Sequence, residues 1–247
     1  MTEIQFEVTC MNIWKEKYLL QQRTEWIIHN IIESIQPDIL LLQEVTNENV
    51  IDIIQALKEK KYQYRVSNEK RHVFEIIASK WNIIEFRFQK FSTSNLNNGI
   101  LYCDIQVYNH RVTLASGNID ENLNGNEQLN CALNFLSNHN KYIIYGVSSH
   151  LGNELYPFKN ERWKDAWVLS GKNKLNEYTY DFDKNINLTK NRKSRPDRIF
   201  TQGTNNIYKY ELIGTLPICS STPTSKLKVQ PSTHFGIHCR IVYKFFD

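Results

Sequence analysis

Apolar and polar residues alternate along the first part of the chain. Every second residue over 4–10 is apolar, which is typical of a half-buried strand. Apolar residues then recur at helical spacing over 19–35, and Pro37 marks the end of that predicted helix. The segment 38–45, DILLLQEV, is almost continuously apolar, as in a strand that is covered on both faces.

The rest of the chain mixes strands with helices. Thr46 or Asn47 is expected to cap a helix that runs to about Lys60. The further predicted elements are two strands within 73–89, two within 99–116 joined by an Asn109–His110 turn, a helix over 126–138, a strand from 142, a short helix over 161–169, and strands at 195–200, 206–214 and 235–246. This mixture predicts one α/β domain over 1–247, with two sheets sandwiched between helices.

Composition narrows the class of protein. Hydrophobic residues make up 41% of the chain, enough for a sizeable core, yet no window approaches the ~18 uninterrupted apolar residues of a membrane span. The first residues lack the basic start and apolar stretch of a signal peptide. We therefore expect an intracellular protein, cytoplasmic or nuclear and not secreted, with no membrane partner. Five cysteines without a CxxC pair indicate neither a disulfide framework nor a zinc site.

The net charge of +4 permits an anionic partner without demanding one. The densest basic run is 190–198, KNRKSRPDR. The sequence allows two interpretations of this run, a solvated loop or a segment that contacts phosphate.

Polar residues stand where several apolar strands end. Asn12, Glu44 and Ser149 follow predicted strands, and His234 precedes the last one. Each alone is explained as a turn or cap residue. Together they predict one rim of a sheet, which is the usual place for an α/β active site.

Motifs in this order resemble the endonuclease/exonuclease/phosphatase family, and within it the tyrosyl-DNA phosphodiesterase type 2 branch. The similarity runs over nearly the full chain. The matching segments are MNIW at 11–14, Arg23, PDILLLQEV at 37–45, IIASK at 76–80, DAW at 165–167, YTYDFDKNINL at 178–188, RPDRIF at 195–200 and PSTHFGIHC at 231–239. The resemblance implies a four-layer sandwich of two mixed β-sheets flanked by helices.

The resemblance also implies hydrolysis of phosphodiesters with bound Mg²⁺, which prefers oxygen ligands. In the family a Glu holds the metal, an Asp and an Asn orient the attacking water and a phosphate oxygen, and a C-terminal His stabilises developing charge. Carried over, Asn12 matches the family's first Asn, Glu44 its metal-binding Glu and His234 its C-terminal His.

Several family positions have changed in this chain. The family's GDTNLR aligns with GVSSHL, which places its Asp on Val147, its Asn on Ser149 and its Arg on Leu151. Thr233 stands in place of the Asp that is expected to support the histidine, and Asn118 in place of a phosphate-contacting His. Valine cannot accept a proton or orient a water. The neighbours that offer replacement groups are Asp120, His150, Asn153 and Glu154.

Three functions follow from this pattern. The first is a non-catalytic relative that still binds DNA or RNA 5′ ends, protein–nucleic-acid adducts or phosphorylated partners, with Mg²⁺ bound weakly at Glu44 or not at all. Substrate contacts would come from Tyr178, Arg195 and Arg198, with further candidates Tyr180, Lys190, Arg192 and Lys193, whereas Trp167 is expected to pack. The second is a Mg²⁺-dependent phosphodiesterase with a rearranged site. The third is a protein–protein interaction module.

Overall fold

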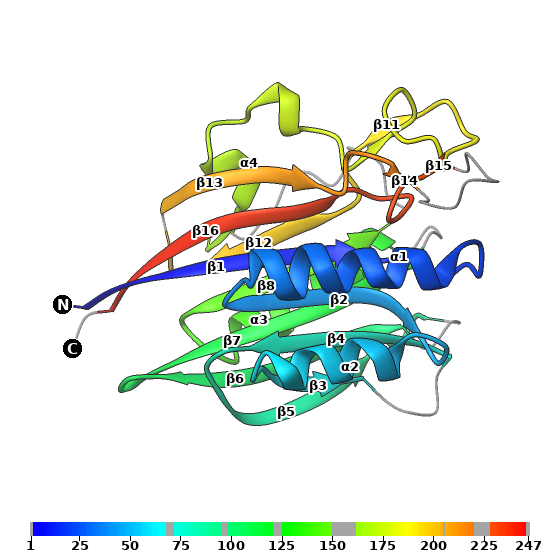
Figure 1. The fold of residues 1–247 in the computed structure, drawn as a ribbon. Coiled ribbons are helices and arrows are strands. Elements are labelled where there is room, and N and C mark those ends of the chain that lie inside the picture. The colour runs from blue at the N-terminus through cyan, green and yellow to red at the C-terminus, as the bar shows by residue number, and fades with distance from the viewer. Residues whose placement is uncertain are drawn as a thin grey trace.

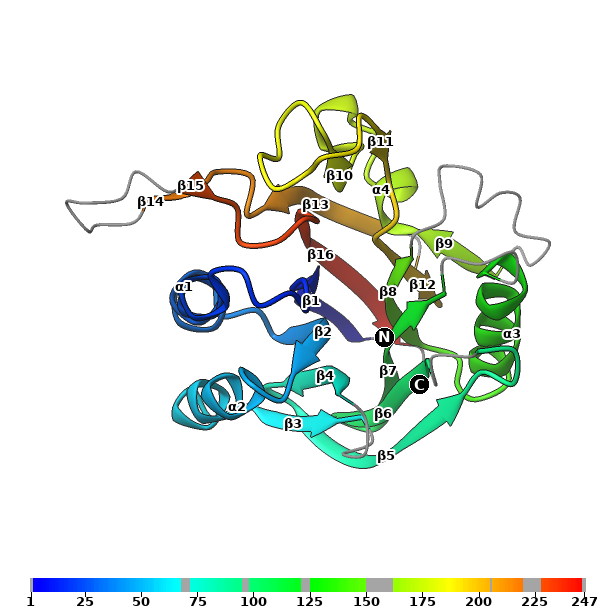
Figure 2. The ribbon, with the colours of Figure 1, turned by 90° about the vertical axis from the view of Figure 1, so that its right-hand side faces the viewer.

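Two β-sheets pack face to face, and helices cover their outer faces (Figures 1 and 2). The computed structural model describes residues 2–67, 72–94, 98–120, 125–149, 162–204, 206–219 and 228–245. Within these residues the order of layers is helices, sheet, sheet, helix, so the predicted α/β four-layer sandwich is confirmed.

The first sheet has six strands in the order β13–β16–β1–β2–β4–β3. Its strands are β13 (Asn206–Ile213), β16 (Gly236–Phe245), β1 (Thr2–Asn12), β2 (Ile39–Thr46), β4 (Val73–Ser79) and β3 (Gln63–Val66). The sheet is mixed, because β1 runs parallel to β2 and antiparallel to β16. Its outer face is covered by α1 (Leu20–Trp26), the π-helical η1 (Ile27–Ile35) that continues it, and α2 (Val50–Glu59).

The second sheet also has six strands, in the order β5–β6–β7–β8–β12–β9. Its strands are β5 (Asn82–Lys90), β6 (Gly99–Val107), β7 (His110–Ile119), β8 (Ile143–Ser149), β12 (Arg198–Gln202) and β9 (Trp163–Asp165). It is mixed as well, since β7 and β8 are parallel. The helix α3 (Gly125–Ser137) packs on its outer face.

Short elements complete the described part of the chain. They are α4 (Ala166–Leu169), η2 (Lys174–Asn176), the ribbon of β10 (Tyr180–Asp181) with β11 (Lys193–Ser194), and the ribbon of β14 (Ile218–Cys219) with β15 (Lys228–Val229).

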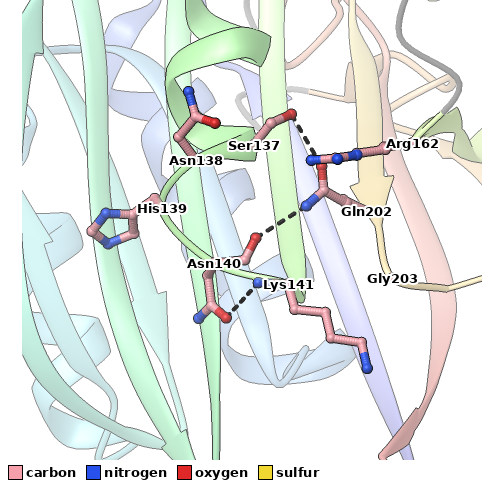
Figure 3. Close-up of a pocket in the computed structure, with 8 residues that line it drawn as sticks. All are labelled: Ser137, Asn138, His139, Asn140, Lys141, Arg162, Gln202 and Gly203. Carbon is pink, nitrogen blue, oxygen red and sulfur yellow. Dashed lines mark hydrogen bonds between the residues drawn. The ribbon is translucent and has the colours of Figure 1, made fainter.

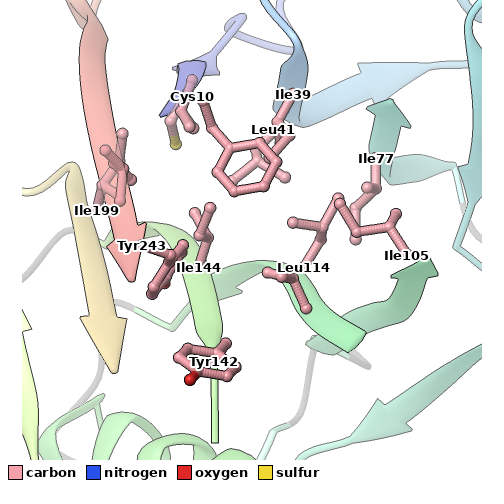
Figure 4. Close-up of a cluster of buried hydrophobic side chains, with 14 of the residues drawn as sticks. Cys10, Ile39, Leu41, Ile77, Ile105, Leu114, Tyr142, Ile144, Ile199 and Tyr243 are labelled. Atoms are coloured by element: carbon pink, nitrogen blue, oxygen red, sulfur yellow. The ribbon is translucent and has the colours of Figure 1, made fainter. Parts of the chain in front are cut away.

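The space between the sheets holds the largest apolar cluster (Figure 4). Cys10 and Leu41 from the first sheet meet Leu114 and Ile144 from the second. Alternation explains this, because successive side chains of a strand point to opposite faces and only one set faces the other sheet. The fold therefore brings the ends of β1, β2, β7 and β8 together at one edge of this core.

Most of the long predicted elements are confirmed, including both strands within 73–89, the helix near 126–138 and the last strand. The short helix predicted over 161–169 is wrong in part, because Trp163–Asp165 form strand β9. The Trp163 indole donates to the Leu133 carbonyl at 3.1 Å, which holds that segment in the sheet under α3. The helix begins only after Asp165, whose carboxylate accepts from the backbone N–H of Trp167 at 2.9 Å.

Two boundaries also differ from the prediction. Asn49, and not Thr46 or Asn47, precedes α2. The turn between β6 and β7 consists of Tyr108 and Asn109, since the second strand already begins at His110. Such shifts of a few residues arise because a periodic pattern places an element more firmly than its ends. No helix of the described residues is long and apolar enough to cross a membrane.

Candidate active site

Two hydrogen bonds join the sheets at the edge where β1, β2, β7 and β8 end. Asn12 Nδ2 donates to Ser148 Oγ at 3.1 Å, and Asn118 Nδ2 donates to Glu44 Oε1 at 3.3 Å. Both bonds are buried and join residues more than 70 positions apart in the sequence. Sequence-distant polar groups therefore meet at one point, as the strand-end pattern predicted for Asn12 and Glu44.

Next to this edge, Gly146 of β8 lies very close to side chains of the other sheet. A Cβ added to Gly146 in β8 would lie 2.7 Å from both Cys10 Sγ and Leu41 Cδ1 of the other sheet. A larger residue here would meet these side chains and require them to shift, which favours glycine at this point of β8. The next inward-facing residue, Ser148, is thereby brought within hydrogen-bond distance of Asn12.

Glu44 is presented by an irregularity in β2. The register between β2 and β4 shifts between Leu42 and Val45, and Glu44 has a φ of 60°, in the left-handed region. A bulge re-aims a side chain in this way, and a strained non-glycine conformation is often found at functional sites. The carboxylate is buried, with 5% of the residue exposed, and accepts from the Lys15 backbone N–H at 3.2 Å.

The charge on Glu44 is stabilised despite its burial. Burial alone would raise the pKa of this carboxyl, but the positive charge of His234 and the Lys15 N–H outweigh it, so the pKa is lowered. Glu44 is thus an ionised carboxylate at neutral pH, held inside the fold.

His234 forms a buried pair with a carboxylate that lies just before β12. Its Nδ1 lies 2.8 Å from Asp197 Oδ2, which also accepts from the Thr179 hydroxyl at 2.6 Å. Burial would lower the pKa of His234, but the Asp197 carboxylate and the Glu44 charge raise it above its usual value. The ring of Tyr180 packs edge-on against the imidazole, with centroids 5.6 Å apart.

Comparison with known proteins supports a family assignment. No protein-family model matches the chain. Two curated relatives named 5′-tyrosyl-DNA phosphodiesterase, from Caenorhabditis briggsae and Caenorhabditis elegans, are each 25% identical to it over 85% and 94% of its length. The chain spans 62% and 66% of the length of these relatives.

Solved structures show the same architecture. Truncated Caenorhabditis elegans TDP2 has a TM-score of 0.83 at 22% identity, covering 96% of this chain and 98% of that one. TDP2 of D. rerio, complexed with single-strand DNA product, has a TM-score of 0.82 at 18% identity over 97% and 99%. A Bacteroides thetaiotaomicron endonuclease/exonuclease/phosphatase family protein has a TM-score of 0.77 at 15% identity over 98% and 96%.

The chain has the fold of the endonuclease/exonuclease/phosphatase family. Within the family it is similar to the 5′-tyrosyl-DNA phosphodiesterases over nearly its whole length. The order of its motifs had indicated this family, and the similarity of the fold agrees.

The support of the histidine differs from the sequence-based expectation. Thr233 stands in place of the family's Asp, which was expected to support His234. In the structure a carboxylate is supplied by Asp197, from the RPDRIF segment, so His234 keeps an acidic partner although Thr233 offers none. Ser232 contributes as well, because its hydroxyl donates to the Asn12 carbonyl at 2.7 Å and accepts from the His234 N–H at 3.1 Å.

The end of β8 carries hydroxyl groups and an apolar side chain. Val147 is buried in the cluster on the α3 side of the sheet, together with Tyr145 and Phe200. Ser148 faces Asn12, whereas the Ser149 hydroxyl donates to the Pro196 carbonyl at 3.0 Å. The β8 side chain that faces the site is therefore that of Ser148, and not the Val147 side chain on which the family's Asp was aligned.

Most of the other residues that were singled out near the end of β8 are not described by the structure. Leu151 and the candidate replacements His150, Asn153 and Glu154 lie outside the described residues. Asp120 is described and buried, and its carboxylate accepts from Asn98 and from Gln128 of α3, which gives it a structural role.

The two predicted arginine contacts have structural partners. Arg195 and Arg198 are buried, and their guanidiniums lie 2.8 Å and 3.4 Å from the carboxylate of Asp165. The guanidinium carbon of Arg195 also lies 4.3 Å from the centroid of the Trp167 ring, in line with a packing role for that ring. This burial argues against direct phosphate contact by either arginine.

The exposed part of the basic run is 190–193. The charge of Arg192 acts on His234, where it lowers the pKa of the imidazole, so Arg192 lies on the side of the site. Tyr178 is half-buried, and its role as a substrate contact stays a prediction.

One surface hollow lies away from the site (Figure 3). It has a volume of about 450 Å³ and is lined by residues 137–141 after α3, by Arg162 and by Gln202–Gly203. Gln202 spans it, accepting from the Ser137 hydroxyl and donating to the Asn140 carbonyl. None of the site residues lines this hollow.

The donors available to a metal at the site are oxygen atoms. The described residues contain no group of three or more His, Cys, Asp or Glu side chains placed to hold an ion. Glu44 offers one carboxylate, and the buried Oδ1 of Asn118 beside it has no hydrogen-bond partner among the described residues. This set suits a hard cation such as Mg²⁺, which keeps several water or phosphate oxygens around one or two carboxylates.

Proposed function

We propose that the chain binds phosphorylated ends of nucleic acid, or of protein–nucleic-acid adducts, without hydrolysing them. Support comes from the relatives named 5′-tyrosyl-DNA phosphodiesterase and from the TDP2 structure with a single-strand DNA product. Further support comes from the charged groups that remain at the site, Glu44 and the Asp197–His234 pair.

The observation that carries the proposal is the side chain at the end of β8. Ser148, a hydroxyl, faces Asn12 where a carboxylate would be needed to orient and deprotonate water. A general base must accept a proton near the working pH, and an ordinary serine does not. The described carboxylates at the site have other partners, since Asp197 binds His234 and Glu44 binds Asn118 and Lys15. Losing a general base costs a rate factor of about 10² to 10⁴.

The retained residues favour binding of an anion. His234 is buried, and the Asp197 and Glu44 charges raise its pKa, which favours the protonated imidazole beside the site. Asp197 fixes the orientation of that imidazole through Nδ1. A cation held by the ionised Glu44 would neutralise charge on the phosphate oxygens when bound. These groups stabilise a phosphoryl group whether or not a nucleophile is activated.

Binding and turnover are tested with matched oligonucleotides in the presence of Mg²⁺. We expect a 5′-phosphorylated oligonucleotide to bind at least about tenfold more tightly than its 5′-hydroxyl counterpart, and His234→Gln to remove most of this difference. Affinity should fall as salt rises, because phosphate contacts release counterions. A 5′-tyrosyl oligonucleotide should bind without measurable turnover. Absence of any salt-sensitive binding would sink the proposal and favour a protein partner.

A second function, a Mg²⁺-dependent phosphodiesterase with a rearranged site, is favoured by one observation. The Asp197–His234 pair is intact, so the group that stabilises charge on the phosphoryl oxygen is in place. One measurement, made on the wild type and on a matched variant, distinguishes the two functions. Release of tyrosine from the 5′-tyrosyl oligonucleotide, lost in Glu44→Ala, would establish the enzyme and overturn the non-catalytic proposal.

A further inference from the structure

Asn118 places a carboxamide at the centre of the site. The inward-facing residues of β7 alternate from Val112 through Leu114 and Ser116 to Asn118, so the last of them reaches the edge where Glu44 lies. Asn118 is 8% exposed, and its Nδ2 donates to Glu44 Oε1 across the gap between the sheets.

The other atom of this carboxamide is left without a partner. Asn118 Oδ1 is buried and accepts no hydrogen bond within the described residues. Its orientation is fixed by Glu44, because a flipped amide would set Oδ1 against a carboxylate oxygen and lose the hydrogen bond from Nδ2. More than nine in ten buried polar atoms have a partner, so an exception at a site indicates a group that binds there.

The charge around this oxygen indicates which class of group it receives. Glu44 is an ionised carboxylate directly beside it, and a second acceptor next to an anion attracts a cation or a hydrogen-bond donor. Amide oxygens are ordinary ligands of hard divalent cations, which take them together with carboxylates and water. The histidine that the family resemblance implies at this position would present a nitrogen, whereas Asn118 presents a hard oxygen.

We propose that Asn118 Oδ1 is a ligand, together with the Glu44 carboxylate, for a divalent cation of the Mg²⁺ class. The role of this cation, which is to neutralise a bound phosphate, rests on the proposed function. It concerns the cation alone and is tested without nucleic acid.

The probe is Mn²⁺, whose free concentration is followed by electron paramagnetic resonance, with Mg²⁺ titration calorimetry as a second measurement. In Asn118→Leu, which keeps the size and removes the oxygen, the Mn²⁺ affinity should fall by at least about tenfold. Asn118→Asp keeps an oxygen at the same place and adds charge, so it should bind Mn²⁺ more tightly than the wild type. Without metal, two adjacent carboxylates should lower the melting temperature of Asn118→Asp, and Mn²⁺ should restore it.

Gln128→Met is the control. It removes a buried amide whose two polar atoms both bond to Asp120, away from the site, and its Mn²⁺ affinity should equal that of the wild type. Equal affinity in Asn118→Leu and the wild type, with loss in Glu44→Gln, overturns the role of Asn118 and leaves the proposed function standing. If Asn118→Leu does not fold, Asn118→Asp decides, and a failure to tighten Mn²⁺ binding overturns the role. Intact Mn²⁺ binding in a protein that binds no phosphorylated end supports the inference while the proposed function fails.

Discussion

Asp197 and His234, which lie 37 positions apart in the sequence, form a buried ion pair with Nδ1 2.8 Å from Oδ2. Thr179 donates to the same carboxylate oxygen and accepts from the Asp197 backbone N–H, so the carboxylate is fixed on both sides. The pair joins the segment before β12 to the segment before β16. It favours the protonated form of the imidazole at the site without any contribution from Thr233.

Asp197→Asn should lower the pKa of His234. The Asp197 charge and hydrogen bond raise this pKa against the opposing effect of burial, and an amide removes the charge while the burial remains. The imidazole of Asp197→Asn should then titrate at a lower pH than that of the wild type. Titration of the His234 Cε1–H signal by NMR measures this directly. An unchanged midpoint in Asp197→Asn would show that another group sets the charge.

The same pair predicts how stability depends on pH. His234 has a raised pKa in the folded state, so its contribution is fully present below the unfolded value of about 6.5 and is lost as pH rises through the folded value. The His234 contribution to the free energy of unfolding of the wild type should therefore fall as the pH rises above about 6.5. In His234→Gln this part of the fall should disappear. Urea unfolding at a series of pH values measures it, and parallel curves for the two proteins would contradict the prediction.

The long elements of the fold could be predicted from the sequence because each buries a full face and therefore has a clear apolar pattern. The apolar run of β2 and the alternation of β1 and β16 identify strands without any tertiary information. The two-residue ribbons β10–β11 and β14–β15 were missed, because a ladder of two pairs has no period to detect.

The candidate site was predictable only in part, for a related reason. Asn12, Glu44 and His234 end or precede long strands, so their positions could be read from the pattern. The partner of His234 could not, since Asp197 reaches it only through the pairing of β12 with β8. Alternation shows that Val147 and Ser148 face opposite ways, but only the packing against α3 shows which of them is turned from the site.

Substituting Asp at two adjacent residues of β8 tests this orientation. Val147→Asp places an unpaired carboxylate in the apolar cluster under α3 and should cost at least about 3 kcal/mol of stability. Ser148→Asp places it where Asn12 Nδ2 already donates, and should cost clearly less. Urea unfolding of the two variants gives the comparison, and a larger loss in Ser148→Asp would mean that the orientation of β8 is wrong.

Activity of the same pair tests the missing carboxylate. Ser148→Asp should release tyrosine from a 5′-tyrosyl oligonucleotide with Mg²⁺ at a rate about 10² times that of the wild type or more, because it supplies a base near Asn12. Val147→Asp should give no gain at a temperature where it remains folded. The double variant Ser148→Asp with Glu44→Ala is the control, since its turnover should return to the background. A Ser148→Asp variant that folds, binds Mn²⁺ and shows no gain would mean that more than one group is lacking.

Arg23 should act on the site through the loop that follows β1. It is fully buried in α1, and its guanidinium donates to the backbone carbonyls of Ile13, Trp14, Glu16 and Tyr18. Burial lowers its pKa to about 10, which still leaves it charged at neutral pH. The loop that it holds carries Lys15, whose N–H binds the Glu44 carboxylate.

Arg23→Lys should therefore destabilise the protein by about 2–4 kcal/mol, because an ammonium cannot reach four carbonyls with the geometry of a guanidinium. With the Lys15 N–H less firmly placed, Mn²⁺ affinity at Glu44 should also change, by several-fold, although Arg23 does not contact the carboxylate. Gln21→Ala, on the exposed face of α1, is the matched control and should change neither quantity. Urea unfolding and Mn²⁺ titration on the same samples separate the two effects. Loss of stability with unchanged Mn²⁺ affinity would limit Arg23 to a structural role.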